Sequence, residues 1–321
     1  MPEIFTTTTG IFPKITSEKT YPNLRVNLHK LDRGEISADE FEVVIQKNIE
    51  RAVGEQISVG IDFPTDGSIR WMDLFSPFVR SWEGITRRGI HRFYNTNTLY
   101  GEPVVEGELL APQVSDDVTS NKTLEDFKFA QKISSNTKAI LPGVFTFTNA
   151  CVDNFYQDSQ RLRSAISRNL IKEAQNLILA GAKIIEIHEI ELAWSQFSIK
   201  EISEIYSEFG KLDAKIIVIS YFKNFSSEVA EALVEVGCGI GIDFSQLVEF
   251  SNLPENTVLQ AGVVDSRETK LEKVEDLQKL KSEILTKFSN CSEIIFSTSS
   301  HVEYLPHARA IEKISLLKNL K

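Results

Sequence analysis

Residues 181–192 read GAKIIEIHEIEL, and this stretch decides the expected fold. Residues 184–187 form an apolar strand that is too short for a helix, and a helical pattern over residues 161–179 runs into it. His188 and Glu189 follow at the end of the strand. Carboxylates and imidazoles are costly to bury unless they are paired, and parallel β/α folds place their sites at such strand ends. The alternative interpretation is that both residues begin a solvated loop.

The alternation of strand and helix extends along the chain. The predicted strands cover residues 4–9, 57–63, 139–142, 183–188, 215–219, 239–242, 258–264 and 294–297, with a weaker candidate at 103–108. Short connections between alternating strands and helices favour a parallel sheet. Eight or nine strands therefore predict an α/β fold, a single (β/α)8 TIM-type barrel that forms one domain over residues 1–321. An open, doubly wound sheet is the alternative, but no GxGxxG phosphate loop follows the first strand.

The composition is that of a globular protein with a large core. The chain has 321 residues, of which 42% are hydrophobic and 25% are charged. A formal net charge of −10 argues against nucleic acid as a partner, because phosphate binding requires clustered Lys and Arg. The three cysteines lie far apart without a CxxC spacing, which is typical of a reducing compartment. No apolar run of about 18 residues appears, so we expect a cytoplasmic protein without a membrane partner.

Polar residues at the predicted strand ends are the candidate substrate-binding residues. Because the carboxyl ends of parallel strands meet at one end of a barrel, we expect these side chains to share one mouth. Arg267 can hold a carboxylate with a bidentate fork, and pairing with Asp265 is the alternative. The candidates are Lys14, Asp66, Asn97, His188, Glu189, Tyr221, Asp243, Asp265, Arg267, Ser300 and His301.

Four stretches resemble a known family in their residues and in their order. They are TTTTGIFPK at 6–14, GAKIIEIHE at 181–189, LQAGVVD at 259–265 and SSHVEYLP at 299–306. Together they resemble cobalamin-independent methionine synthase, which is built from two similar β/α barrels in tandem, and this chain is about the size of one. The resemblance implies a methyltransferase of methionine biosynthesis, with a folate and homocysteine as substrates. Lys14 would then meet the glutamate tail of the folate.

The resemblance also indicates which of the two barrels this chain is similar to. The family's catalytic barrel holds zinc through a His-x-Cys, a Glu on the next strand and a late Cys, and the metal lowers the pKa of the homocysteine thiol. These ligands fall on Val218, Ser220, Asp243 and Ser300, so three of the four are lost. Residues 220–222 and 262–267, SYF and GVVDSR, are more similar to the N-terminal, zinc-free barrel. The resemblance therefore implies no cofactor or metal bound by this chain.

Three functions are left open by the sequence. In the first, the chain is the N-terminal-like barrel that assists a separate catalytic barrel subunit carrying zinc. In the second, it is a stand-alone methyltransferase or lyase of the same superfamily with a changed substrate. For this function, an unconventional metal site from His188, Glu189, Asp243 and His301 is conceivable, although structural pairing explains the same residues. In the third, it is a non-catalytic binding or regulatory relative.

Overall fold

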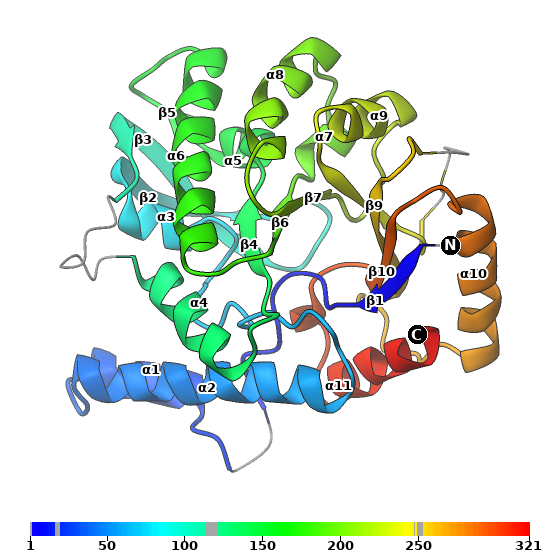
Figure 1. The fold of residues 1–321 in the computed structure, drawn as a ribbon. Helices are drawn as coiled ribbons and strands as arrows, with labels where there is room; N and C mark the ends of the chain where they lie inside the picture. Colours follow the sequence, from blue (N-terminus) through cyan, green and yellow to red (C-terminus); the bar gives the residue numbers. More distant parts are fainter. Residues whose placement is uncertain (1, 17–19, 113–120, 247, 249–252) are drawn as a thin grey trace.

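A parallel sheet of seven strands forms the centre of the molecule (Figure 1). The computed structural model describes residues 2–16, 20–112, 121–246, 248 and 253–321. The strand order is β1-β10-β9-β8-β7-β6-β4. These strands are β1 (Glu3–Thr6), β4 (Ala139–Pro142), β6 (Ile184–His188), β7 (Lys215–Ile219), β8 (Gly239–Asp243), β9 (Val258–Val264) and β10 (Glu293–Thr298). Nearly all of their residues are buried, as expected of parallel strands that are covered on both faces.

Residues 62–65 connect the two edges of this sheet. Thr7, directly after β1, makes a parallel bridge with Phe63, and Thr65 makes a parallel bridge with Lys138, directly before β4. The backbone N–H of Lys138 also donates to a carbonyl of this segment at 2.9 Å. The segment therefore takes the place of an eighth strand between β1 and β4. This arrangement confirms the predicted β/α barrel.

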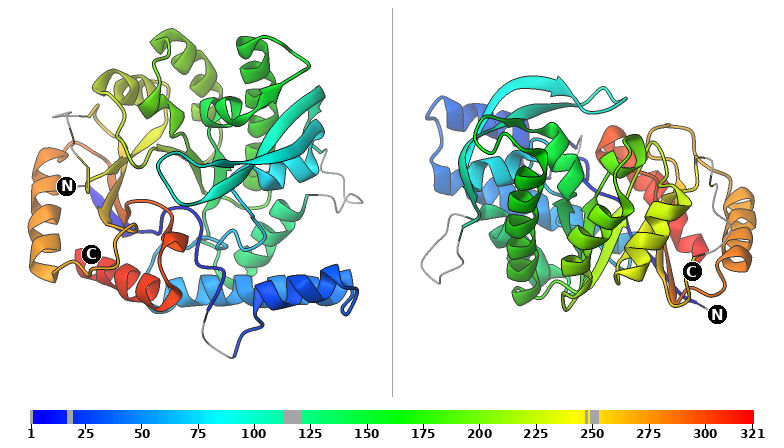
Figure 2. Two further views of the ribbon diagram at one scale, coloured as in Figure 1. Left: turned by 180° about the vertical axis from the view of Figure 1, so that it is seen from behind. Right: turned by 90° about the horizontal axis from the view of Figure 1, so that it is seen from above.

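Helices surround the barrel (Figures 1 and 2). They are α1 (Leu24–Asp32), α2 (Ala38–Ser58), α3 (Ser76–Ser81), α4 (Lys122–Ile133), α5 (Val144–Ala150), α6 (Ser159–Leu179), α7 (Glu191–Trp194), α8 (Ile199–Gly210), α9 (Ser227–Glu235), α10 (Val274–Lys287) and α11 (His307–Ser315), with the short 3-10 helices η1 (Val302–Tyr304) and η2 (Leu316–Leu320). The strand predicted at 57–63 begins too early, because α2 continues to Ser58. Gly60, with φ of +92°, then turns the chain toward the barrel.

A second, small sheet lies outside the barrel. It consists of β2 (Glu83–Arg92), β3 (Leu99–Leu110) and β5 (Val152–Asp153). The candidate strand at 103–108 is thus part of β3, which pairs antiparallel with β2 rather than with a barrel strand. Figure 2 shows this hairpin lying across one side of the barrel. Its turn, residues 93–98, is the part that reaches the candidate site.

The core fills the space between the sheet and the helices. The aromatic residues Trp71, Phe75, Phe78 and Trp82 are at most 4% exposed, so this stripe is core rather than a ligand platform. Apolar side chains of the barrel strands and of α6, α8 and α9 complete the same cluster. Within the described parts of the chain, no helix is long and apolar enough to cross a membrane.

Candidate functional site at the mouth of the barrel

The carboxyl ends of the barrel strands meet at one end, which we call the mouth. His188 and Asp243 are the last residues of β6 and β8. Tyr221 follows β7 by two residues, and Ser300 and His301 follow β10. Because all of these strands run parallel, the polar residues predicted at their ends lie at the same end of the barrel. The structure thereby brings polar residues from distant parts of the sequence into one region.

Three buried side chains form an imidazole cluster at the centre of the mouth: His188, Tyr221 and His301. The Tyr221 hydroxyl lies 2.8 Å from Nε2 of His301 and 3.2 Å from Nδ1 of His188. Nε2 of His301 and Nδ1 of His188 are 3.1 Å apart. Gly10, with φ of +64°, passes so close that a Cβ there would lie 2.5 Å from the His301 ring. The site therefore requires glycine at position 10.

A buried ion pair lies beneath this cluster, and sequence reasoning missed it. Glu186 accepts hydrogen bonds from Nε2 of His188 at 2.8 Å, from the backbone N–H of Gly10 at 3.0 Å and from Gln260 at 2.7 Å. It also pairs with the ammonium of Lys138. Burial opposes the ionisation of Glu186, but the Lys138 charge and the His188 hydrogen bond hold its pKa well below the usual range. The available signal was a charged residue in the middle of an apolar strand.

The histidine of β6 is neutral in this environment. Burial lowers the pKa of His188 to about 4, although the Glu186 carboxylate partly opposes that shift. A neutral imidazole has one N–H donor and one acceptor nitrogen. Since a carboxylate only accepts, the hydrogen of His188 is on Nε2 and its Nδ1 is the acceptor.

Glu189 points away from the imidazole cluster. Its carboxylate accepts hydrogen bonds from the backbone N–H groups of Phe145 and Thr146, at 2.9 and 2.7 Å, and from the hydroxyls of Thr146 and Tyr206. These groups lie at the start of α5 and on α8. Burial raises the pKa of Glu189 to about 7, against the effect of these donors. Its position indicates a structural role in holding α5 and α8 to the barrel.

A cavity of about 670 Å³ opens above the cluster. Among the predicted residues, Asn97, Arg267 and His301 line it. The hairpin turn and Phe222, Glu303 and Tyr304 also line the cavity, and the sequence analysis did not predict them as site residues. The Arg267 guanidinium lies 5.4 Å from the centre of the Phe222 ring, and its Nε is 3.8 Å from Oδ1 of Asp265. Arg267 is thus held by a ring face and a carboxylate at the edge of the cavity.

Lys14 and Glu303 form an ion pair at the same wall, with Nζ and Oε2 3.0 Å apart. Burial alone would raise the pKa of Glu303, but the Lys14 charge and the His301 contact hold it at about 2. The charge of Lys14 is therefore already compensated. An incoming anion would have to compete with Glu303 for it.

The remaining predicted residues are held by hydrogen bonds within their own loops or, for Ser300, to the neighbouring loop. Asp66 accepts a hydrogen bond from the Ser68 backbone at 2.8 Å, and burial raises its pKa to about 7. Asp243 accepts from the backbone and hydroxyl of Ser245, and burial raises its pKa to about 6. The hydroxyl of Ser300 lies 2.9 Å from that of Ser266.

The conceivable metal site of His188, Glu189, Asp243 and His301 is not assembled. Only the two imidazoles contact each other, since Glu189 holds α5 and Asp243 holds its own loop. Among the residues that the structure describes, no group of three or more His, Cys, Asp or Glu side chains is placed to bind a metal ion.

The positions that match the family's zinc ligands do not fit a zinc ion either. Val218 lies next to Ile187 and Ile240 in the sheet register. Because side chains alternate along a strand, Val218 faces the helices while Glu186 and His188 face the barrel interior. The Ser220 hydroxyl donates to the Lys223 carbonyl at 2.9 Å. These side chains offer neither the thiolate nor the imidazole that such a site needs.

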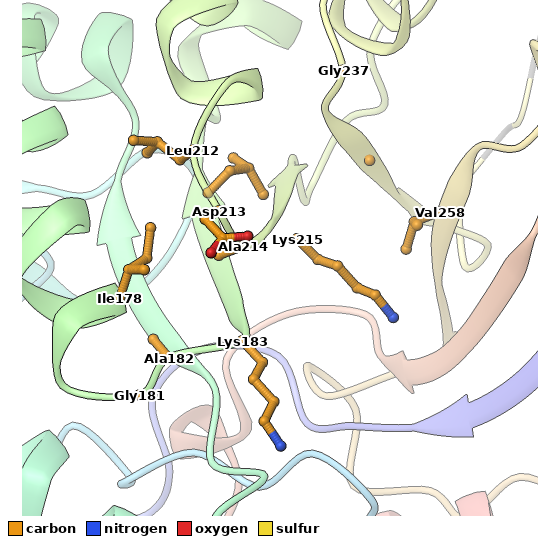
Figure 3. Close-up of a pocket in the computed structure, with 12 residues that line it drawn as sticks. Ile178, Gly181, Ala182, Lys183, Leu212, Asp213, Ala214, Lys215, Gly237 and Val258 are labelled. Atoms are coloured by element: carbon orange, nitrogen blue, oxygen red, sulfur yellow. The ribbon is translucent and has the colours of Figure 1, made fainter.

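A second cavity of about 660 Å³ lies at the opposite end of the barrel (Figure 3). The amino ends of β6, β7 and β8 line it, and the figure shows Lys183 and Lys215 extending from this region. Lys215 pairs with Glu293. None of the predicted site residues is among those that line this cavity, so the mouth remains the candidate site.

Comparisons with known proteins agree with this architecture. A family model described as the N-terminal domain of cobalamin-independent synthase matches residues 79–288. The chain is 23% identical over 297 residues to a methionine synthase of Saccharolobus solfataricus, covering 90% of this chain and 85% of that protein. It is 24% identical over 212 residues to a methionine synthase of Sulfurisphaera tokodaii, covering 63% and 58%.

Solved structures show the same fold. A B12-independent methionine synthase from Shewanella, in complex with selenomethionine, superposes with a TM-score of 0.74 at 16% identity, covering 98% of this chain and 95% of that one. A putative vitamin-B12 independent methionine synthase from Listeria monocytogenes gives a TM-score of 0.70 at 15% identity, covering 99% and 98%.

Proposed function

Because the chain belongs to the cobalamin-independent methionine synthase family, we propose that it serves methyl transfer in methionine biosynthesis and binds a folate-like or homocysteine-like substrate at its mouth. The observation that supports this proposal most directly is the cavity of about 670 Å³ at the carboxyl ends of the strands. Such cavities are where β/α barrels bind their substrates. Arg267 at its edge supplies a cation for a substrate carboxylate.

We further propose that methyl transfer requires a separate catalytic barrel subunit. A thiol with a pKa of about 8.5 is mostly protonated at neutral pH, and in the family a bound zinc activates it. The matching residues here, Val218, Ser220, Asp243 and Ser300, do not fit that ion. The chain would then be the N-terminal-like barrel that assists a subunit with the full ligand set.

Metal analysis and activity assays test this division of roles. Protein expressed with zinc should contain far less than one zinc per chain, and the chain alone should not form methionine from homocysteine and a methylated folate. Calorimetry should detect binding of homocysteine or of a polyglutamylated folate. One zinc per chain together with turnover would contradict the proposal. Absence of heat with either compound would favour a non-catalytic relative.

The second candidate function is a stand-alone methyltransferase or lyase with a changed substrate. The observation that favours it is the imidazole cluster of His188, Tyr221 and His301, of which His301 lines the cavity, since such a cluster can move protons without a metal. Turnover of an amino-acid thiol or thioether by the metal-free chain would support this function.

A further inference from the structure

We propose that Phe222 is a positioning residue of the mouth. Its strained backbone holds an aromatic ring against Arg267, so that the guanidinium presents its two terminal nitrogens to the carboxylate of a bound ligand. The role of Phe222 rests on the geometry of the loop after β7. The carboxylate ligand rests on the proposed function, since homocysteine and a folate with its glutamate tail both carry this group.

The backbone of Phe222 is strained. Its φ of +71° lies in the left-handed region, which a bulky side chain rarely adopts. Among the described residues, five non-glycine residues have a positive φ, and of these only Tyr94 and Phe222 are aromatic. Phe222 lines the cavity, and Tyr94 directly follows Phe93, which also lines it. Strain of this kind gathers at ligand sites, where the surrounding structure maintains it.

The loop after β7 maintains this conformation on both sides of Phe222. Before it, the Ser220 hydroxyl donates to the Lys223 carbonyl at 2.9 Å. After it, the Asn224 side chain accepts from the backbone N–H of Asp243 at 2.8 Å and donates to the carbonyl of the same residue at 3.0 Å. Because these hydrogen bonds hold both ends of the loop, the backbone at position 222 cannot relax without breaking one of them.

The ring of Phe222 is held in place as well as its backbone. It packs edge to face against the Tyr221 ring at a centroid distance of 4.8 Å and lies 6.2 Å from the Tyr304 ring. Both tyrosines in turn contact His301 of the imidazole cluster. The guanidinium of Arg267 lies over the Phe222 ring, with its Cζ 5.4 Å from the ring centre. The strained loop thus places a fixed aromatic face under this cation.

This contact leaves the hydrogen-bonding nitrogens of Arg267 available. A guanidinium that lies over an aromatic face is attracted through its plane, whereas its N–H groups point outward within that plane. Its Nε lies 3.8 Å from Oδ1 of Asp265. Within the part of the chain that the structure describes, no protein atom accepts a hydrogen bond from its two terminal nitrogens. Two such nitrogens at the edge of the cavity fit a carboxylate in a bidentate fork.

The ligand-free protein tests the strain. Phe222→Gly and Phe222→Ala both remove the ring, but only glycine adopts a positive φ readily. Phe222→Gly should therefore unfold at a higher urea concentration than Phe222→Ala. Phe197 is the matched control, because it is also half-buried and lies near an arginine, Arg163 at 5.8 Å, without a positive φ. There the alanine variant should be at least as stable as the glycine variant. A glycine variant that is no more stable than alanine at position 222 would overturn the proposal.

Calorimetry with homocysteine and with a polyglutamylated folate tests the positioning. Phe222→Gly should weaken binding by about twofold to thirtyfold, the range expected for the loss of a cation–π contact, even though its backbone is relaxed. Phe222→Tyr keeps the aromatic face and should retain most of the affinity. Phe197→Gly should leave the affinity unchanged. Equal affinities of Phe222→Gly and the natural protein would overturn the proposal.

A double-mutant cycle decides whether Phe222 acts through Arg267. In the Arg267→Gln background, Phe222→Gly should cause little further loss of affinity, because the guanidinium that the ring positions is already gone. A merely structural role of the ring, or a direct contact between the ring and the ligand, would instead give losses that multiply. Multiplying losses would overturn the proposal. The carboxamide of homocysteine, which lacks the carboxylate, should bind the natural protein and Phe222→Gly equally.

The outcomes separate this proposal from the proposed function. Binding of either compound with multiplying losses would overturn the positioning role of Phe222 and leave the proposed function intact. If neither compound binds, the proposed substrates and the carboxylate ligand of this proposal are both contradicted. In that case the stability of Phe222→Gly relative to Phe222→Ala still decides whether the loop after β7 is strained.

Discussion

Lys138 and Glu186 form an ion pair inside the barrel, and their side chains are only 1% and 0% exposed. The two residues are 48 positions apart, and Lys138 lies directly before β4 while Glu186 lies in the middle of β6. Gly10 and Gln260 add hydrogen bonds to the same carboxylate. The pair and its hydrogen bonds thus connect β4, β6, β9 and the segment after β1, beneath the imidazole cluster.

Removing the cation of this pair should destabilise the fold strongly. Lys138→Met leaves a buried carboxylate without its counter-charge, so we expect a loss of about 3–5 kcal/mol in the free energy of unfolding. Adding Glu186→Gln should recover part of it, because the unpaired charge is then gone. Urea unfolding measures both. The matched control is Lys215→Met, whose pair with Glu293 is 41% exposed on the lysine side and should contribute only about 0–1 kcal/mol. Equal losses in the two single variants would contradict this prediction.

Gly10→Ala should displace the imidazole cluster. The backbone φ of +64° is unfavourable for alanine by about 1–2 kcal/mol, and the added Cβ would lie 2.5 Å from the His301 ring. Gly34→Ala is the control, since it has a similar φ of +69° but nothing within 4 Å of the new Cβ. We expect a larger loss of stability for Gly10→Ala, and changed histidine spectra only for that variant. Identical effects would mean that the close approach at Gly10 is unimportant.

Asp243 should make stability fall as the pH rises. Its pKa is raised from 3.8 to about 6 by burial, so between these values the folded state binds more protons than the unfolded state. Stability is then lost as the pH increases from about 4 to 6, because unfolding allows the carboxyl group to ionise in water. Oδ2, which lacks a hydrogen-bond partner, is the natural position for the proton.

Asp243→Asn should remove this contribution to the pH dependence, while Asp66, His188 and Glu189 keep theirs. We expect the variant to be more stable than the natural protein at pH 8, by on the order of 2 kcal/mol. Urea unfolding from pH 4 to 8 measures the slope. Asp158→Asn is a contrasting control, because the backbone N–H of Arg161 lowers the pKa of that exposed carboxylate and gives the opposite sign. A slope in Asp243→Asn that equals the slope of the natural protein would contradict this prediction.

Arg267 should contribute to anion binding at the mouth. Losing a hydrogen bond to a charged group costs about 1.5–3 kcal/mol, so Arg267→Gln should weaken binding of a carboxylate ligand by roughly tenfold to a hundredfold. The affinity of Arg267→Lys should lie between those of the natural protein and Arg267→Gln, because lysine keeps the charge but neither the two-pronged hydrogen bonding of the guanidinium nor its contact with Phe222. Calorimetry with homocysteine and a polyglutamylated folate measures this. Arg309→Gln, on the exposed face of α11, should leave the affinity unchanged.

The sequence by itself determined the fold class and indicated which end of the barrel carries the candidate site. The apolar run at 184–187 and its polar end are local features, and their repetition along the chain predicted parallel strands whose ends share one mouth. Local patterns are sufficient to predict parallel strands for two reasons. An apolar run shows that a strand is buried on both faces, and a helix between two strands returns the chain so that both strands run in the same direction.

Only the tertiary structure decided how the barrel closes and which polar groups meet. Residues 62–65 make just two bridges, so they lack the length and pattern of a strand. Glu189 directly follows β6 and Asp66 directly follows residues 62–65, yet they hold a helix and a loop, whereas His188 and Tyr221 enter the cluster. The register between strands far apart in sequence sets these contacts, together with the hairpin turn over the mouth. No local pattern encodes that register, because it depends on packing around the whole barrel.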